Sequence, residues 1–414
     1  MRAAALPWLV VSLGSIAASA GACGSGFSAA PGSGGRGGAD GVGSTSSSGT
    51  VVAASSSSTS SGSGTSSHSS SSGGPACAAP AVMCPSSSTC TDLSSNANNC
   101  GACGYSCNGQ ACSNGTCNLF APGSWVPISD GADLAIDTAN VYWTTGVPTT
   151  GEVLSVPKTG GPPALVAMGQ DQPRGIATDG THVFWTNGHG GTVMQADVNG
   201  MNPITLASSQ TNPYGIATDG VNVYWTNDTT PGTVSQMAVG GGPTTVVVTT
   251  PLSSPLKITV TATDLFWTSP GAGTVEAATI GGGNHRVVAS FQSAPHGITN
   301  GAGGIFFTNS TFTAGFGDGG VGNDVVEVTK TGGSATPALN TLATGQNKPW
   351  DLATDGVTVY WGDQGDGTIN AVPITGGLVV HLATGQTTPE GMAVDTTSVY
   401  WIDNGGHMVS RAAK

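Results

Sequence analysis

The chain has 414 residues, of which only 8% are charged, and its formal net charge at pH 7 is −13. Ten Lys and Arg residues against 23 Asp and Glu are too few to neutralise a run of phosphates, which excludes nucleic acid as a principal ligand. The same imbalance excludes direct adsorption of the protein to an anionic membrane.

The N-terminus has the features of an export signal. Arg2 is followed by an apolar run too short to span a membrane as a mature helix, and small residues then lead to Cys23. The "AGAC" that ends at Cys23 resembles the cleavage box of bacterial lipoproteins, which implies acylation of Cys23. Ala20 stands where that box usually has Leu, so an ordinary signal peptide cut after Ala20 or Ala22 is the alternative. We expect a signal peptide over residues 1–22 and a cell-envelope location, as an outer-membrane lipoprotein or a secreted protein.

A low-complexity segment follows the signal. Residues 24–75 are almost wholly Gly, Ser, Ala and Thr, a composition that cannot bury a core. Residues 23–76 are therefore predicted to form a disordered linker, and as a random coil the linker would span about 40 Å on average. Any attachment to a membrane is expected only through a lipid on Cys23.

Residues 77–118 are predicted to form a cysteine-rich disulfide module. Eight of the nine cysteines lie in this segment: Cys77, Cys84, Cys90, Cys100, Cys103, Cys107, Cys112 and Cys117. An even cluster in an exported chain predicts four disulfides, whose pairing the spacing leaves open. Zinc on the C-x-x-C of Cys100 and Cys103 is the alternative, but no His lies in the segment, and we expect no metal.

Three pieces of this segment carry a resemblance to a known family. "CTDL" (Cys90–Leu93), "NNCGACGYSC" (Asn98–Cys107) and "CSNGTC" (Cys112–Cys117) resemble the stigma-specific-type cysteine-rich module. Related modules occur in surface proteins of deltaproteobacteria, including myxobacteria, and the resemblance implies a similar bacterial surface protein.

The remainder of the chain is a sevenfold repeat. The aromatic residue that is third in "VYW" recurs at spacings of 42, 40, 42, 40, 54 and 40 residues, as Trp143, Trp185, Trp225, Trp267, Phe307, Trp361 and Trp401. A typical copy holds four short strand-like segments, at Gly175–Asp179, His182–Asn187, Gly191–Val198 and Pro203–Ser209. No window has a sustained helical period. Four strands in each of seven copies predict an all-β protein, with a seven-bladed β-propeller over residues 119–414.

The ends of the array predict how the ring closes. The last copy has three strand segments, and "SWVPIS" (Ser124–Ser129) lies before the first copy. An N-terminal strand would therefore complete the C-terminal blade and remove an open edge. "VYWTN" resembles the YWTD repeat of low-density-lipoprotein-receptor-type propellers, and this resemblance implies the fold rather than a particular activity.

One position varies while the repeat around it stays nearly constant. The residue before each "GIA" strand reads Ala132, Arg174, Tyr214, Leu256, His296, Trp350 and Glu390. Since inner strands line the centre of a propeller, we expect a ligand site at the channel mouth, formed by Arg174, Tyr214, His296, Trp350, Asp351 and Glu390. The long loop Asn309–Asp324 opens on the same face, and binding or tolerated length explain it equally well.

Two functional classes fit this ring. The first is a non-enzymatic envelope protein that binds a protein or a glycan, with Tyr214 and Trp350 stacking and Arg174 and Glu390 making polar contacts. The second is an exported lyase resembling streptogramin lyase, in which His296 with Glu390 or Asp351 supplies a general base and its orienting partner. A passive envelope protein is the third reading. We favour binding by a monomer without cofactors, and treat calcium at the Asp-rich loops as a minor possibility.

Overall fold

The computed structural model describes residues 77, 81–84, 90–100, 103, 107, 112–113, 115–118, 133–310, 323–329 and 338–414. The predicted signal, Cys23, the linker, Ser124–Ser129 and most of the loop Asn309–Asp324 lie outside the described residues. In the part of the chain that is described, no helix has the length and apolarity needed to cross a bilayer.

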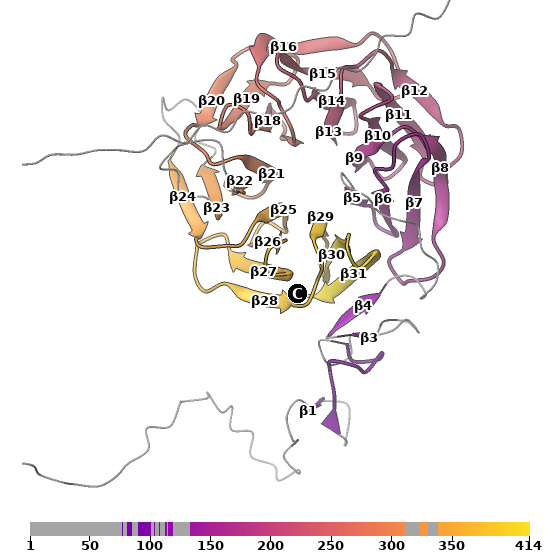
Figure 1. Ribbon diagram of the computed structural model, residues 1–414, viewed down its shortest axis with the longest axis vertical. Helices are drawn as coiled ribbons and strands as arrows, with labels where there is room; N and C mark the ends of the chain where they lie inside the picture. The colour runs from indigo at the N-terminus through magenta and orange to yellow at the C-terminus, as the bar shows by residue number, and fades with distance from the viewer. Residues whose placement is uncertain are drawn as a thin grey trace, which may run out of the picture. The chain divides into compact units, whose positions relative to one another are not determined.

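Seven antiparallel sheets stand in a ring, each with its first strand nearest the centre (Figure 1). The strands of the successive blades are β5 (Leu134–Ile136), β6 (Asn140–Thr144), β7 (Gly151–Pro157), β8 (Ala164–Gln170); β9 (Pro173–Thr178), β10 (His182–Asn187), β11 (Thr192–Asp197), β12 (Ile204–Ala207); β13 (Pro213–Thr218), β14 (Asn222–Asn227), β15 (Gly232–Ala238), β16 (Thr245–Leu252); β17 (Ile258–Val260), β18 (Asp264–Ser269), β19 (Thr274–Thr279), β20 (Arg286–Ala289); β21 (Pro295–Asn300), β22 (Gly304–Asn309), β23 (Asp324–Thr329), β24 (Leu339–Ala343); β25 (Pro349–Thr354), β26 (Thr358–Asp363), β27 (Thr368–Pro373), β28 (Val380–Ala383); and β29 (Pro389–Val394), β30 (Ser398–Asp403), β31 (Met408–Ala413). The predicted seven-bladed propeller is thereby confirmed.

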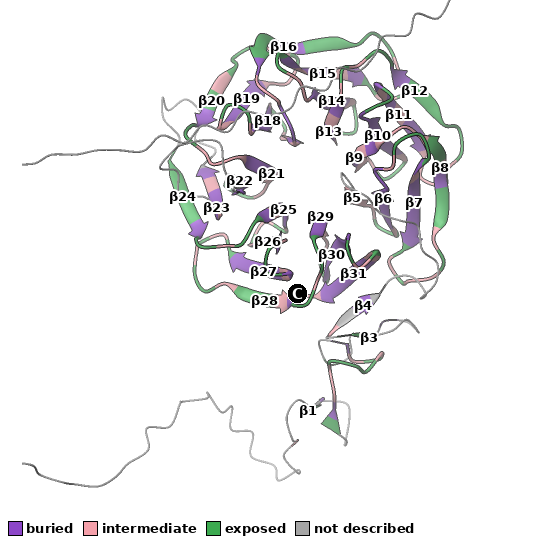
Figure 2. Cartoon of the chain, in the orientation of Figure 1, coloured by how far each residue is buried: buried purple, intermediate pink, exposed green. Residues whose placement is uncertain are grey.

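The repeated aromatic residue is the packing contact between blades. Trp185 is fully buried, and its core cluster joins Val183 of its own blade to Tyr142 and Val153 of the preceding blade. Burial of each large apolar side chain contributes roughly 1.5–3 kcal/mol, so adjacent blades stabilise one another. The second and third strands are mainly buried, whereas the outer strands are largely exposed (Figure 2).

A threonine after that aromatic residue links the inner strands of adjacent blades. Thr186 Oγ1 accepts the N–H of Gly175 in its own blade and donates to the carbonyl oxygen of Tyr214 in the next blade, at 3.1 and 2.6 Å. The same double contact is made by Thr144, Thr226, Thr268 and Thr308. Gly362 and Ile402 replace the threonine in the last two blades. Threonines of the first five blades therefore hold the backbone of the channel mouth from the first blade to the sixth.

The last blade is completed by a strand from the N-terminal side, as the sequence predicted. Strand β31 pairs with β4 (Thr116–Asn118) through Ser410↔Asn118 and Arg411↔Cys117. The strand differs from the expected one, because β4 belongs to the cysteine-rich segment and Ser124–Ser129 lies outside the described residues. Backbone pairing at this edge is therefore supplied by a segment that disulfides also hold.

The cysteine-rich segment contains β1 (Val82–Met83), β2 (Cys90–Thr91) and β3 (Cys112–Ser113), with β3 paired to β4. Four disulfides join its eight cysteines as Cys77–Cys90, Cys84–Cys103, Cys100–Cys112 and Cys107–Cys117. The disulfide-rich module expected from the sequence is present. Three of its sulfurs lie within 4.8 Å of one another, but each is already bonded to another sulfur, so none is a thiolate available for zinc.

Candidate functional site

The variable position of the repeat lies on the face of the propeller where the inner strands begin. In β9 the pairing with β10 shifts between Pro173 and Ile176, so Arg174 and Gly175 form a bulge. Equivalent shifts occur at the start of β13, β21 and β25, whereas in β29 Glu390 pairs with Ile402 and only Gly391 is left out. The position lies at the channel mouth because it stands at the start of each inner strand. The bulge changes the direction of the side chain that it carries.

The residue that follows the variable position in each copy forms a second layer of the site. Gly175, Gly215 and Gly297 have no room for a side chain, because a Cβ on each would collide with the carbonyl oxygen of Tyr214, Leu256 or Trp350 in the next blade. A fourth copy has Gly391, at a φ of 48°. The other three copies carry Asp133, Lys257 and Asp351 at this position.

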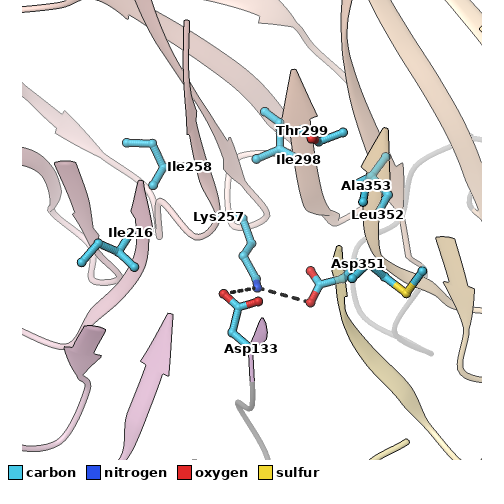
Figure 3. Close-up of a pocket in the computed structure, with 10 residues that line it drawn as sticks. Asp133, Ile216, Lys257, Ile258, Ile298, Thr299, Asp351, Leu352 and Ala353 are labelled. Carbon is cyan, nitrogen blue, oxygen red and sulfur yellow. Dashed lines mark hydrogen bonds and ion pairs between the residues drawn. The ribbon is translucent and has the colours of Figure 1, made fainter. Parts of the chain in front are cut away.

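These three charged side chains meet at the centre of the ring, although they come from the first, fourth and sixth blades. Lys257 Nζ lies 3.0 Å from Asp133 Oδ2 and 3.3 Å from Asp351 Oδ2 (Figure 3). Asp351 Oδ2 also accepts the N–H of Gly391 at 3.0 Å, in the blade where Ile402 has replaced the threonine of the relay. We call Asp133, Lys257 and Asp351 the central triad.

Burial and the neighbouring charges together set the pKa values of Asp133 and Lys257. Burial raises the pKa of Asp133, and the neighbouring carboxylate of Asp351 raises it further, against the opposing effect of Lys257. Burial alone would lower the pKa of Lys257, but the two carboxylates more than offset this effect and hold it above its usual value. Lys257 is therefore a charged ammonium at neutral pH rather than a nucleophilic amine.

A cavity of about 160 Å³ lies beside the triad. Its wall consists of the triad and side chains of the inner strands, among them Ile216, Ile298 and Leu352 (Figure 3). Its volume suits a few water molecules or a single small group rather than a whole drug-sized ligand. A larger ligand would therefore have to bind above it, at the mouth.

His296 is the most unusual group at the mouth. It is 6% exposed and stacks on Trp350, with ring centroids 3.6 Å apart and planes inclined by 31°. Its Nδ1 is buried, has no hydrogen-bond partner among the described residues, and lies 3.9 Å from Asp351 Oδ1, beyond hydrogen-bond distance. Burial, and then the charge of Lys257, lower the pKa of His296 well below its usual value against the smaller opposing effect of a hydrogen bond to the Trp350 backbone, so the imidazole is neutral at pH 7.

The other predicted residues form two further sets. The Arg174 guanidinium lies 4.9 Å from the centre of the Tyr214 ring and donates to Gln172 Oε1 at 3.1 Å. Burial raises the pKa of Tyr214 to about 12, so it stays protonated. Glu390 is 8% exposed and accepts from the amides of Gln364 and Asn404 at 3.1 and 3.4 Å. Leu256 is a buried apolar residue, and Ala132 lies outside the described residues.

The structure thus brings His296, Trp350 and Asp351 together as one group. Of the two acids expected to serve His296, Asp351 faces its Nδ1. Sequence reasoning missed Asp133 and Lys257, although one signal was present. A position occupied by Gly in four copies and by a charged residue in three departs from the repeat as clearly as the ring residue before it.

The recurring acids at the opposite end of the inner strands are turn residues. Asp179 Oδ1 accepts the N–H groups of Thr181 and His182, at 2.8 and 2.6 Å. Asp137 Oδ2 accepts the hydroxyl of Tyr142 at 2.8 Å. Such Asx turns give these acids a structural role without a metal or a substrate.

No protein-family model matches the chain, and neither does any curated protein. Among solved structures, a streptogramin B lyase shares 14% identity at a TM-score of 0.59, over 72% of this chain and 96% of that one. A catalytically inactive His-to-Ala variant of virginiamycin B lyase from Staphylococcus aureus, with quinupristin, shares 13% identity at 0.55, over 70% and 98%. Nidogen in its laminin complex shares 18% identity at a TM-score of 0.44, over 57% and 89%. At identities below 25% the two lyase structures establish the shared propeller fold alone, and the nidogen similarity carries no argument.

Proposed function

We propose that the propeller is a binding module whose ligand, a protein or a glycan, docks at the channel mouth on His296, Trp350 and Asp351, with Arg174, Tyr214 and Glu390 around them. One observation carries this proposal. His296 Nδ1 is buried and has no hydrogen-bond partner among the described residues.

A buried polar atom left without a partner costs roughly 1–3 kcal/mol. Repacking His296 as an apolar aromatic residue would remove that cost and keep the stack on Trp350, which makes the imidazole a poor choice for stability alone. A ligand that hydrogen-bonds to Nδ1 recovers the cost on binding. The nitrogen therefore favours a ligand with polar groups that reach below the rim of the mouth.

The expected N-terminal features fit a module held away from its anchor. We propose that the chain is exported and acylated at Cys23, so that the linker over residues 23–76 gives the propeller reach from the cell envelope. The disulfide module would then act as a durable spacer, in keeping with its resemblance to stigma-specific-type modules.

A lyase-type enzyme is the second candidate, and the state of His296 favours it over other enzyme classes. A neutral imidazole can accept a proton, and Asp351, 3.9 Å away, is placed to stabilise the imidazolium that would form. The solved lyases share the fold only, so turnover has to be measured. Incubation of the protein with quinupristin, followed by mass spectrometry, would decide this candidate, and conversion that His296→Phe abolishes would replace binding with catalysis.

Partner capture tests the binding proposal directly. The full chain and its Trp350→Ala and His296→Phe variants would be crosslinked on intact cells of the source organism, with Leu378→Ala as the control because Leu378 is 87% exposed on an outer loop. We expect a partner that the parent and the control retain and both mouth variants lose. Equal capture by all four proteins, or by none, would overturn the proposal.

A further inference from the structure

We propose that the ligand of the channel mouth is a neutral carbohydrate, which stacks one sugar ring on Trp350 and places one hydroxyl between His296 Nδ1 and Asp351 Oδ1. This inference rests on the binding function proposed above and names the chemistry that the mouth selects.

The gap between the two polar atoms selects a hydroxyl. Their separation of 3.9 Å is too long for a direct hydrogen bond, but one oxygen atom can lie about 2.8 Å from both. A carboxylate oxygen accepts hydrogen bonds, so the inserted group must donate to Asp351 Oδ1. With the His296 proton on Nδ1, a hydroxyl accepts from that N–H and at the same time donates its own proton to Asp351.

The central triad excludes the other candidates. A carbonyl or a carboxylate has no proton to donate and would face Asp351 Oδ1 oxygen to oxygen. An ammonium could donate to both atoms, but Lys257 Nζ already lies 3.3 Å from the other oxygen of Asp351 and would repel a second cation. The pair therefore favours an uncharged group that both donates and accepts.

The aromatic pair beside this gap suits the rest of a sugar. Trp350 is partly exposed at the start of β25, and the stacked His296 fixes the orientation of its ring. A pyranose presents an apolar C–H face next to hydroxyls at its edge, which matches a flat aromatic surface with polar atoms at its border. A flat apolar ligand without hydroxyls would leave Nδ1 without a partner.

Formal charge at the mouth disfavours acidic sugars. Asp133, Asp351 and Glu390 stand against Lys257 and Arg174, which is three carboxyls against two cations. The amides that hold the Glu390 carboxylate, from Gln364 and Asn404, offer further neutral hydrogen-bonding groups in the seventh blade. The mouth thus favours neutral hexoses and N-acetylhexosamines over uronic acids.

The test is a calorimetric titration of the full chain with free saccharides. The probes are glucose, galactose, mannose and N-acetylglucosamine with their disaccharides, and glucuronic acid and glucosamine serve as the anionic and cationic comparisons. We expect at least one neutral saccharide to bind, and glucuronic acid to bind at least about tenfold more weakly, as expected for one unfavourable ion contact.

Variants locate the hydroxyl. His296→Phe keeps an aromatic ring against Trp350 and removes the nitrogen, so affinity should fall about tenfold, the effect of one hydrogen bond. His296→Gln restores a side chain that hydrogen-bonds and should recover part of the loss, while Trp350→Leu should abolish binding. Circular dichroism confirms that each variant is folded, and Leu378→Ala is the matched surface control.

The outcomes separate this inference from the binding function itself. If no neutral saccharide binds, but the mouth variants lose a protein partner on cells, the carbohydrate assignment is overturned and the binding function stands. If no saccharide binds, and the mouth variants capture partners on cells as well as the parent does, both the carbohydrate assignment and the binding function are overturned. Saccharide binding that His296→Phe leaves unchanged, or a preference for glucosamine, would also refute the proposed geometry.

Discussion

Replacing Asp363 with Asn is expected to stabilise the protein, and to do so more strongly as the pH rises. Asp363 ends the second strand of the sixth blade, where other blades have Asn187, Asn227 and Asn309. Each Asn donates from Nδ2 to a Gln at or just after the end of the fourth strand of the preceding blade, for example Asn187 to Gln170 at 2.9 Å. An ionised Asp cannot make this donation, whereas a protonated one can.

The structure gives the sign and the size of the effect. Asp363 is 3% exposed, its Oδ1 has no hydrogen-bond partner among the described residues, and burial raises its pKa to about 7. The folded state therefore keeps a proton that the unfolded chain, with a pKa near 3.9, releases, and stability falls as pH rises between those values. At about 1.4 kcal/mol for each pH unit, the advantage of Asp363→Asn should grow by about 3 kcal/mol between pH 5 and pH 8.

Thermal denaturation of parent and variant at both pH values measures that difference. A gain of this size corresponds to a rise in the relative Tm of roughly 5–10 °C. The matched control is Asn187→Asp, which introduces the same acid in the second blade and should lose stability as pH rises. A difference between Asp363→Asn and the parent that is equal at pH 5 and pH 8 would refute the reasoning, because Asp363 would then hold no extra proton.

Three further predictions concern other parts of the ring. Burial raises the pKa of Asp395, but the hydrogen bond from Lys158 and further hydrogen bonds lower it overall, so Asp395→Asn should lower the Tm at pH 7. This deficit should shrink as the pH falls below about 4, the unfolded value, and a deficit that stays constant would contradict the reasoning. Phe291 is 90% exposed and has a φ of 58°, at a position where three copies have Gly. Phe291→Gly should therefore raise the free energy of unfolding, measured by urea denaturation, by about 0.5–1 kcal/mol. A lower free energy of unfolding would show that the phenyl ring packs against the protein. Cys107→Ser with Cys117→Ser should speed hydrogen exchange in β31, and unchanged exchange would show that β4 stays paired without its disulfide.

The fold could be predicted because each copy restates the same local pattern. Strands, turns and buried aromatic residues follow from propensity and spacing within about 40 residues, and closure by an N-terminal strand followed from the missing fourth strand. The identity of that strand did not follow, because Thr116–Asn118 is short and is better explained locally as part of a disulfide module.

The site was predictable only in its first layer. Arg174, His296 and Trp350 break the repeat at a single position, which indicated a location without indicating partners. The meeting of Asp133 with Lys257 depends on the geometry of the whole ring, because no short-range rule relates residues in different blades. The close approach of Gly175 to the Tyr214 carbonyl oxygen of the next blade likewise cannot be predicted from the spacing of residues along the chain.

Closure of the last blade by β4 also sets the order of events during synthesis. Asn118 leaves the ribosome almost three hundred residues before its partner Ser410, so this pairing has the largest sequence separation of any in the ring. The early segment must stay unpaired with β31 until the final strand is made. Blades formed meanwhile can stack one on another as they appear, but the ring closes only when the two ends of the array meet, so we expect ring closure to be the last step of assembly.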